Sequence, residues 1–85
     1  MKLQLRFFAS LREGLGLSEE LVSVPPSVVN TAELRIWLMQ RGEVWAQLFN
    51  AERPIRCAVN QHIAAEDVRI SDGDEVAFFP PVTGG

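Results

Sequence analysis

The residues at the end of the sequence are those whose types and spacing could do chemistry. Gly84-Gly85 directly follow the segment Phe78-Phe79-Pro80-Pro81-Val82-Thr83. Glycine has no Cβ, so another protein can approach its backbone closely, and a carboxylate lies at the tip of this slender segment. Pro80-Pro81 favours an extended polyproline conformation that would hold the segment away from the folded body. The pattern suits insertion into another protein's active site, and a frayed chain end is the open alternative.

Other side chains that could support catalysis occur singly. His62 is the sole histidine and falls in a predicted turn, where an acid–base catalyst would still need an oriented partner. Cys57 is the sole cysteine and lies in an apolar run typical of a buried strand, so we expect a core residue rather than a nucleophile. One cysteine makes an intramolecular disulfide impossible and a four-ligand zinc site implausible. We therefore expect no enzymatic centre, no metal site and no bound cofactor.

Three apolar residues fall where the pattern calls for polar ones. Phe8 shares the polar face of the first predicted strand, Phe79 points away from the apolar face of the last one, and Ile63 follows a predicted turn. Clustered exposed apolar groups usually mark a protein interface. We interpret Phe8, Ile63 and Phe79 as a partner-binding surface, and coverage by a loop is the alternative.

Length and composition indicate one ordinary folded domain. The chain has 85 residues, of which 47% are hydrophobic and 22% charged, with 11 acidic against 8 basic residues and a net charge of −3. This balance argues against nucleic acid as the main ligand, because phosphate binding needs clustered Lys and Arg. No apolar run approaches the roughly 20 residues that span a bilayer, and the N-terminus has no signal-peptide core. We predict a cytoplasmic protein that binds neither nucleic acid nor membrane.

Periodicity and turn signals predict the elements that would position these residues. Strands are expected over residues 2–8, 19–24, 55–60 and 75–79, with a short extended piece around Ile63. Helical turns are expected over residues 10–15, with Ser10 as a possible cap, and around residues 44–49. The main helix begins after Asn30 as its cap, and Gly42 is predicted to stop it.

Strands arranged around one principal helix indicate the α+β class. If the first and last strands pair in the centre of a mixed sheet of four to five strands, they are parallel and the helix crosses one face. This arrangement is the β-grasp of ubiquitin-like proteins. We expect a β-grasp domain over residues 1–79 and a flexible, extended tail over residues 80–85.

Three segments resemble one family. The segment from Ser71 to Gly85 resembles the C-terminus of the small, sulfur-carrying subunit of molybdopterin synthase. Ala58-Val59-Asn60-Gln61 resembles that family's central strand and turn, and Phe7-Phe8-Ala9 followed by Leu11-Arg12-Glu13 is similar to its opening. The resemblance spans the chain, and its most specific part is the Phe-Phe-Pro-Pro-Val-Thr-Gly-Gly ending.

The resemblance implies a non-catalytic carrier whose terminal carboxylate is its working group. An E1-like adenylating enzyme would use ATP to convert Gly85 to an acyl-adenylate, and a sulfur donor protein would turn the adenylate into a thiocarboxylate. The large, catalytic subunit of a heterotetramer would then deliver the sulfur to cyclic pyranopterin monophosphate. Gly84 would let the tail thread a narrow channel. The rest of the implied tail consists of Pro80, Pro81, Val82 and Thr83.

The resemblance also places Phe8, Ile63 and Phe79 where the family presents its apolar docking patch. The same patch is expected to meet the activating enzyme and the large subunit in turn. Alternatives are a sulfur carrier of another pathway, such as the thiamine type, and a ubiquitin-like modifier joined through Gly85 to lysines of target proteins. A plain binding module with a frayed tail is a third possibility.

Overall fold

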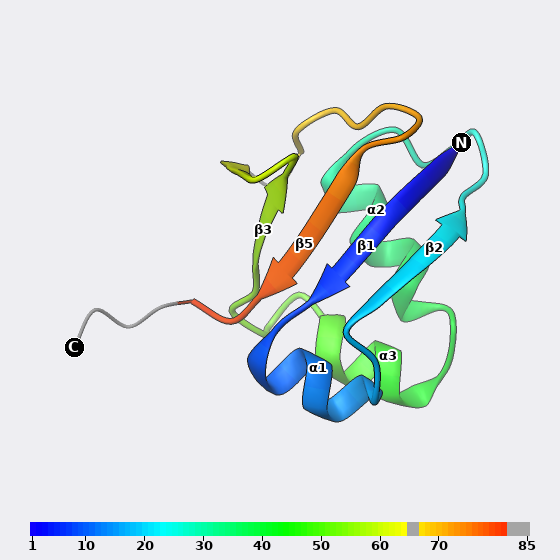
Figure 1. The fold of residues 1–85 in the computed structure, drawn as a ribbon. Helices are drawn as coiled ribbons and strands as arrows, with labels where there is room; N and C mark the ends of the chain where they lie inside the picture. The colour runs from blue at the N-terminus through cyan, green and yellow to red at the C-terminus, as the bar shows by residue number, and fades with distance from the viewer. Residues whose placement is uncertain (65–66, 82–85) are drawn as a thin grey trace.

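The computed structural model describes residues 1–64 and 67–81, which form one mixed sheet with helices packed against it (Figure 1). The elements follow one another as β1 (Lys2–Phe7), α1 (Ala9–Leu15), β2 (Glu19–Ser23), α2 (Thr31–Met39), α3 (Glu43–Phe49), β3 (Arg56–Val59), β4 (His62–Ala64) and β5 (Glu75–Phe79). Within these described residues, no helix has both the length and the apolar character needed to cross a membrane.

The sheet has five strands in the order β2-β1-β5-β3-β4. β1 and β5 pair in parallel at its centre, with Phe7 opposite Phe78, and the other neighbouring strands are antiparallel. α2 crosses one face of the sheet, and the short helices α1 and α3 close one end (Figure 1). This is the predicted α+β, ubiquitin-like β-grasp fold, with three helices in the described residues where the sequence indicated one main helix and two helical turns.

The core lies between the sheet and α2, as the alternation in β1 requires. Leu3, Leu5 and Phe7 are all essentially buried, and they meet the buried residues of β5, α2 and α3. Phe49 of α3 is fully buried, with its ring centroid 5.2 Å from that of Phe78 in an edge-to-face arrangement. Such aromatic pairs add about 0.5–1.5 kcal/mol beyond the area they bury.

Two of the predicted helix ends are wrong, and one is confirmed. Asn30 caps α2 as expected, because its side-chain oxygen accepts a hydrogen bond of 2.8 Å from the backbone N–H of Glu33. Ser10 lies inside α1, since the helix follows β1 directly with Phe8 at the cap position. α2 ends at Met39 in tightened turns, in which the N–H of Gln40 bonds the carbonyl of Trp37, so Gly42 instead precedes α3 as its cap.

Candidate functional site

The base of the tail is set by β5, the central strand of the sheet, which pairs with β1 on one side and β3 on the other. Phe79, its last residue, lies opposite Arg56 of β3, and Phe78 lies opposite Phe7 of β1. The chain then continues through Pro80 and Pro81, which are partly buried. The predicted working residues Gly85 and Gly84, and the tail residues Val82 and Thr83, lie outside the described residues.

Phe8 and Phe79 lie side by side on the sheet face that α2 leaves uncovered. Phe7 and Phe78 point into the core, so the next residue of each strand points outward. Phe8 keeps an extended backbone, and its N–H donates a hydrogen bond of 3.1 Å to the carbonyl oxygen of Phe78. Phe8 is 39% exposed and Phe79 is partly exposed. The structure therefore places both residues at the point where the tail leaves the domain.

Ile63 lies on the same face, two strands away from β1. It is 70% exposed and opposite Ala58 of β3, which is in turn opposite Ala77 of β5. Because alanine side chains are small, Ala58 and Ala77 project little from the sheet between Ile63 and the two phenylalanines. We call the surface formed by Phe8, Ile63, Phe79, Ala58 and Ala77, together with Arg6, the docking face.

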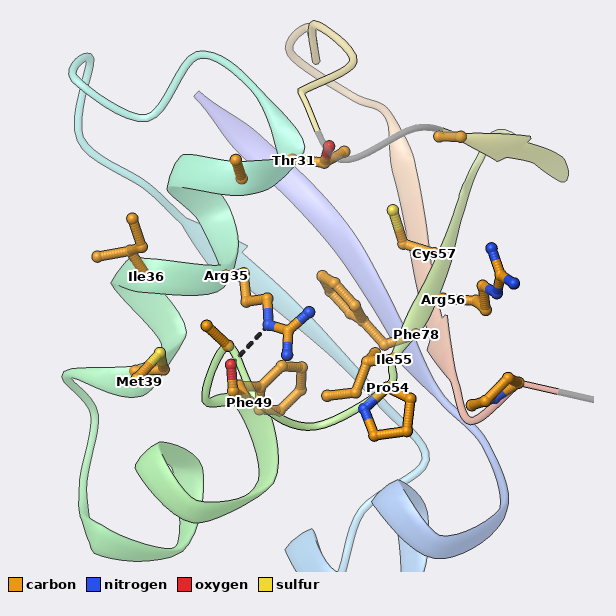
Figure 2. Close-up of a pocket in the computed structure, with 14 residues that line it drawn as sticks. Thr31, Arg35, Ile36, Met39, Phe49, Pro54, Ile55, Arg56, Cys57 and Phe78 are labelled. Atoms are coloured by element: carbon orange, nitrogen blue, oxygen red, sulfur yellow. Dashed lines mark hydrogen bonds between the residues drawn. The ribbon is translucent and has the colours of Figure 1, made fainter.

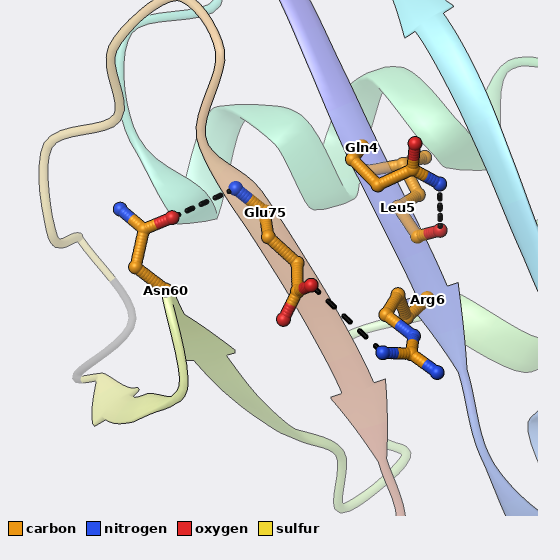
Figure 3. Close-up of polar contacts among 5 residues, drawn as sticks. All are labelled: Gln4, Leu5, Arg6, Asn60 and Glu75. Carbon is orange, nitrogen blue, oxygen red and sulfur yellow. Dashed lines mark hydrogen bonds and ion pairs between the residues drawn. The ribbon is translucent and has the colours of Figure 1, made fainter.

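Arg6 belongs to this face and was not singled out from the sequence. It lies opposite Ala77, with its guanidinium carbon 5.5 Å from the centroid of the Phe8 ring. Its Nη1 atom is 3.9 Å from a carboxylate oxygen of Glu75. A dashed line marks this ion pair in Figure 3. The available signal was the two-residue alternation of β1, which puts Arg6 and Phe8 on one face.

Asn60 fastens the β3–β4 turn to the start of β5. Its side-chain oxygen accepts a 3.0 Å hydrogen bond from the backbone N–H of Glu75 (Figure 3), and its amide nitrogen donates to a carboxylate oxygen of Asp74 at 3.0 Å. Asn60 and Gln61 both have positive φ values, 51° and 70°, which a two-residue hairpin of this kind requires. The segment Ala58–Gln61 thus orients the docking face.

A groove lies on the opposite side of the sheet, between α2 and β3 (Figure 2), with a volume of about 550 Å³. Its walls include Ile36, Met39 and Ile55, and Pro81 at the base of the tail reaches it. Arg35 lies in it and donates hydrogen bonds to the carbonyl oxygens of Phe49 and Asn50, among others, which ties the loop after α3 to α2. None of the three apolar residues predicted to bind a partner lines this groove.

The two lone residues weighed as catalysts take structural positions. Cys57 is 9% exposed and belongs to the core cluster, as its apolar strand predicted. His62 is exposed, and its Nδ1 atom lies 3.1 Å from the carbonyl oxygen of Asn60 within the same turn.

Comparison with known proteins identifies the family. The model of the ThiS family matches residues 5–85. The molybdopterin synthase sulfur carrier subunit of Escherichia coli is 40% identical over 79 residues, which cover 93% of this chain and 94% of that protein. The subunit of the same name from Haemophilus influenzae is 34% identical over 83 residues, covering 98% of this chain and 99% of that protein.

Solved structures agree with this assignment. The putative molybdopterin converting factor subunit 1 of Pyrococcus furiosus superposes with a TM-score of 0.78 at 26% identity, covering 96% of this chain and 99% of that one. A chain from the complex of subunits 1 and 2 of the Helicobacter pylori molybdopterin-converting factor has a TM-score of 0.65 at 26% identity, with full coverage of both chains. The protein therefore belongs to the ThiS family of ubiquitin-like β-grasp proteins, in the group of molybdopterin synthase sulfur carrier subunits.

Proposed function

We propose that this chain is the sulfur carrier for molybdopterin synthesis and that Gly85 carries the sulfur as a thiocarboxylate. Two nearly full-length relatives bear the name of that subunit, which supports the pathway. The ending Phe78–Gly85 supports the working group, because its last two residues, Gly84 and Gly85, offer a carboxylate on a backbone without side chains.

The observation that carries the proposal is that β5 both contributes Ala77 and Phe79 to the docking face and ends where the tail begins. A strand paired on both sides ends at Phe79, beside the exposed Phe8, and the carrier segment starts there. Six residues from Pro80 to Gly85, at roughly 3.3 Å each, reach about 20 Å from this point. A partner that covers the docking face would therefore receive the tip of the tail in a site well below its surface.

The chemistry requires activation of the carboxylate by another protein. A Gly85 carboxylate oxygen attacks the α-phosphate of ATP, which gives the acyl-adenylate and pyrophosphate. A sulfur donor then supplies the sulfur that attacks the carbonyl carbon, and AMP leaves with its electron pair. In the large subunit the thiocarboxylate sulfur is transferred to cyclic pyranopterin monophosphate, and water restores the carboxylate. This chain supplies no catalytic side chain to these steps.

Three partners follow from this scheme: the large subunit of molybdopterin synthase, an E1-like adenylating enzyme and a sulfur donor protein. The similarity to a chain from the Helicobacter pylori complex of subunits 1 and 2 supports the first of them. The large subunit and the activating enzyme would both need the same docking face and the same tail. They would therefore bind in turn. A heterotetramer with the large subunit and a cytoplasmic location stay predictions.

The experiment that tests this function is intact mass measurement after incubation with ATP, the cognate activating enzyme and a sulfide source. The expected product has one oxygen replaced by sulfur, and a chain without Gly85 shows no such product. Cys57→Ser is the matched control, since a persulfide on that thiol would add sulfur without loss of oxygen. The thiocarboxylated chain should then convert the pterin precursor when the large subunit is added.

Each alternative predicts a different outcome. Formation of the thiocarboxylate without pterin conversion would move the chain to another sulfur pathway, such as thiamine thiazole synthesis. Lysine-linked conjugates in place of a thiocarboxylate would indicate a ubiquitin-like modifier. Full molybdopterin formation by a chain lacking Gly84 and Gly85 would contradict the carrier role altogether.

A further inference from the structure

Arg6 places a positive charge among the apolar residues of the docking face, whereas the exposed Arg56, opposite Phe79, lies at the edge of that face. The sheet register sets it opposite Ala77, and Ala77 is followed across the sheet by Ala58 and Ile63. Phe8 lies two residues along the same strand and touches the guanidinium through its ring face. A partner that covers Phe8 and Ile63 together must also cover Arg6.

The guanidinium is poorly paired within the part of the chain that the structure describes. The closest carboxylate oxygen, on Glu75, is 3.9 Å from Nη1, which is an ion-pair distance but too long for a hydrogen bond. The Nε atom is buried and has no hydrogen-bond partner among residues 1–64 and 67–81. The Arg6 side chain is still 42% exposed, so water reaches other parts of it. An arginine has five N–H donors, so the water-exposed ones would need new acceptors if a partner covered this side chain.

Covering the docking face would remove this water. A guanidinium that loses its water without gaining acceptors is strongly unfavourable, whereas a carboxylate that meets it with two parallel hydrogen bonds is among the strongest polar pairs. An entirely apolar partner surface would therefore be rejected here, although the surrounding side chains would accept it. Charge thus adds selectivity to an apolar contact.

We propose that Arg6 is a specificity-determining residue, which selects a large subunit that presents a carboxylate opposite it within an apolar contact surface. This inference rests on the proposed function, because that function names the large subunit as the partner. The competing arrangement is internal: Glu75 could close onto Arg6 when the face is covered, and the partner would then need no charge. If the partner supplies the carboxylate, binding does not need the charge of Glu75. If Glu75 closes onto Arg6, removing that charge weakens binding.

The test is calorimetric titration of the large subunit from the same organism with the full chain, at about 0.05 M and about 0.5 M salt, since ion pairs weaken with ionic strength. Arg6→Met keeps an apolar stem of similar length and should weaken binding at low salt by about tenfold or more, because arginines at interface centres are often hot spots. The same variant should lose most of the salt dependence that the unmodified chain shows. Glu75→Gln should bind as tightly as the unmodified chain or more tightly.

Arg6→Lys and Arg69→Met complete the series. Lysine keeps the charge but lacks the planar fork, so it should restore part of the affinity and the salt dependence. It also keeps the proposal testable if the methionine variant does not fold. Arg69 is exposed beside Asn30 at the start of α2, away from this face, and its substitution should change nothing.

Four results would overturn the inference. Equal or tighter binding by Arg6→Met would show that the large subunit offers no carboxylate there, and an Arg6→Lys variant with no more affinity or salt dependence than Arg6→Met would show that the charge itself is not recognised. A loss with Glu75→Gln as large as that with Arg6→Met would assign the counter-charge to Glu75. If the unmodified chain does not bind the large subunit at all, the proposed function fails together with the inference. If the unmodified chain binds and the Arg6 variants bind equally well, only the inference fails.

Discussion

The hydrogen bond from the backbone N–H of Phe8 to the carbonyl oxygen of Phe78 extends the parallel pairing of β1 and β5 by one residue. It ties the first apolar residue of the docking face to the last strand before the tail. The distance between the docking face and the base of the tail is therefore fixed by the sheet rather than by a loop. A partner that recognises Phe8 and Phe79 also determines where the tail enters it.

Phe79→Ala should weaken binding to the large subunit by about 2 kcal/mol, or about thirtyfold, because a partly exposed aromatic at the centre of an interface is a typical hot spot. The side chain is on the outer face, so the thermal unfolding midpoint should change little. Titration calorimetry of the complex and a thermal melt of the free chain measure the two effects.

Leu21→Ala is the matched control for this prediction. Leu21 is 65% exposed on the same side of the sheet, opposite Gln4, but it lies on the edge strand β2 away from the tail. Its substitution should leave the affinity unchanged. Similar losses for both variants would mean that the partner covers the whole sheet face and that Phe79 has no special place in it.

The fold could be predicted where the signal is local. Leu3, Leu5 and Phe7 alternate with polar residues, and all three are buried. Asn30 has the side chain that caps a helix, and it does so. The ends that were predicted wrongly depend on the path of the chain. Ser10 cannot cap α1 because β1 runs directly into that helix, a fact that its own neighbours in sequence do not show.

The candidate site likewise contains residues that the local sequence pattern predicts and one that depends on the order of the strands. Alternation alone assigned Phe8 and Phe79 to the outer face, because each follows a buried residue of a clear strand. Arg6 was overlooked, since a charged residue on a polar strand face is ordinary. Its importance comes from Ala77 and Ala58, which only the strand order brings beside it. The roles of Val82 to Gly85 stay predictions.

Asn60→Ala should lower the free energy of unfolding by about 2–3 kcal/mol, because it removes two side-chain hydrogen bonds and leaves alanine at a positive φ. Asn60→Gly separates the two causes, since glycine accepts this φ but makes neither bond. The glycine variant should lose about half as much. Urea unfolding measures both, and equal stabilities for the unmodified chain and the glycine variant would show that the two side-chain hydrogen bonds of Asn60 contribute nothing.

Asn30→Ala should cost about 1 kcal/mol, the usual effect of removing a helix cap. The hydrogen bond at stake is the one that the side-chain oxygen accepts from the Glu33 N–H. Asn30→Ser should keep most of the stability, because serine is also a good cap. A serine variant as unstable as the alanine variant in urea would attribute the effect to another contact of Asn30.

Gly84→Ala tests whether the tail must pass through a narrow channel. One added methyl group at this position should leave binding to the large subunit unchanged, because the docking face lies on the folded domain. It should slow sulfur transfer to the pterin precursor by about 100-fold, since a displacement of about 1 Å at a reacting group can have that effect. Single-turnover transfer from the purified thiocarboxylate measures this step without the preceding activation.

Thr83→Ala, which removes bulk one residue earlier, should transfer sulfur at close to the normal rate. If Gly84→Ala also transfers at the normal rate, glycine at this position serves the activating enzyme instead, and the loss should then appear in the yield of thiocarboxylate.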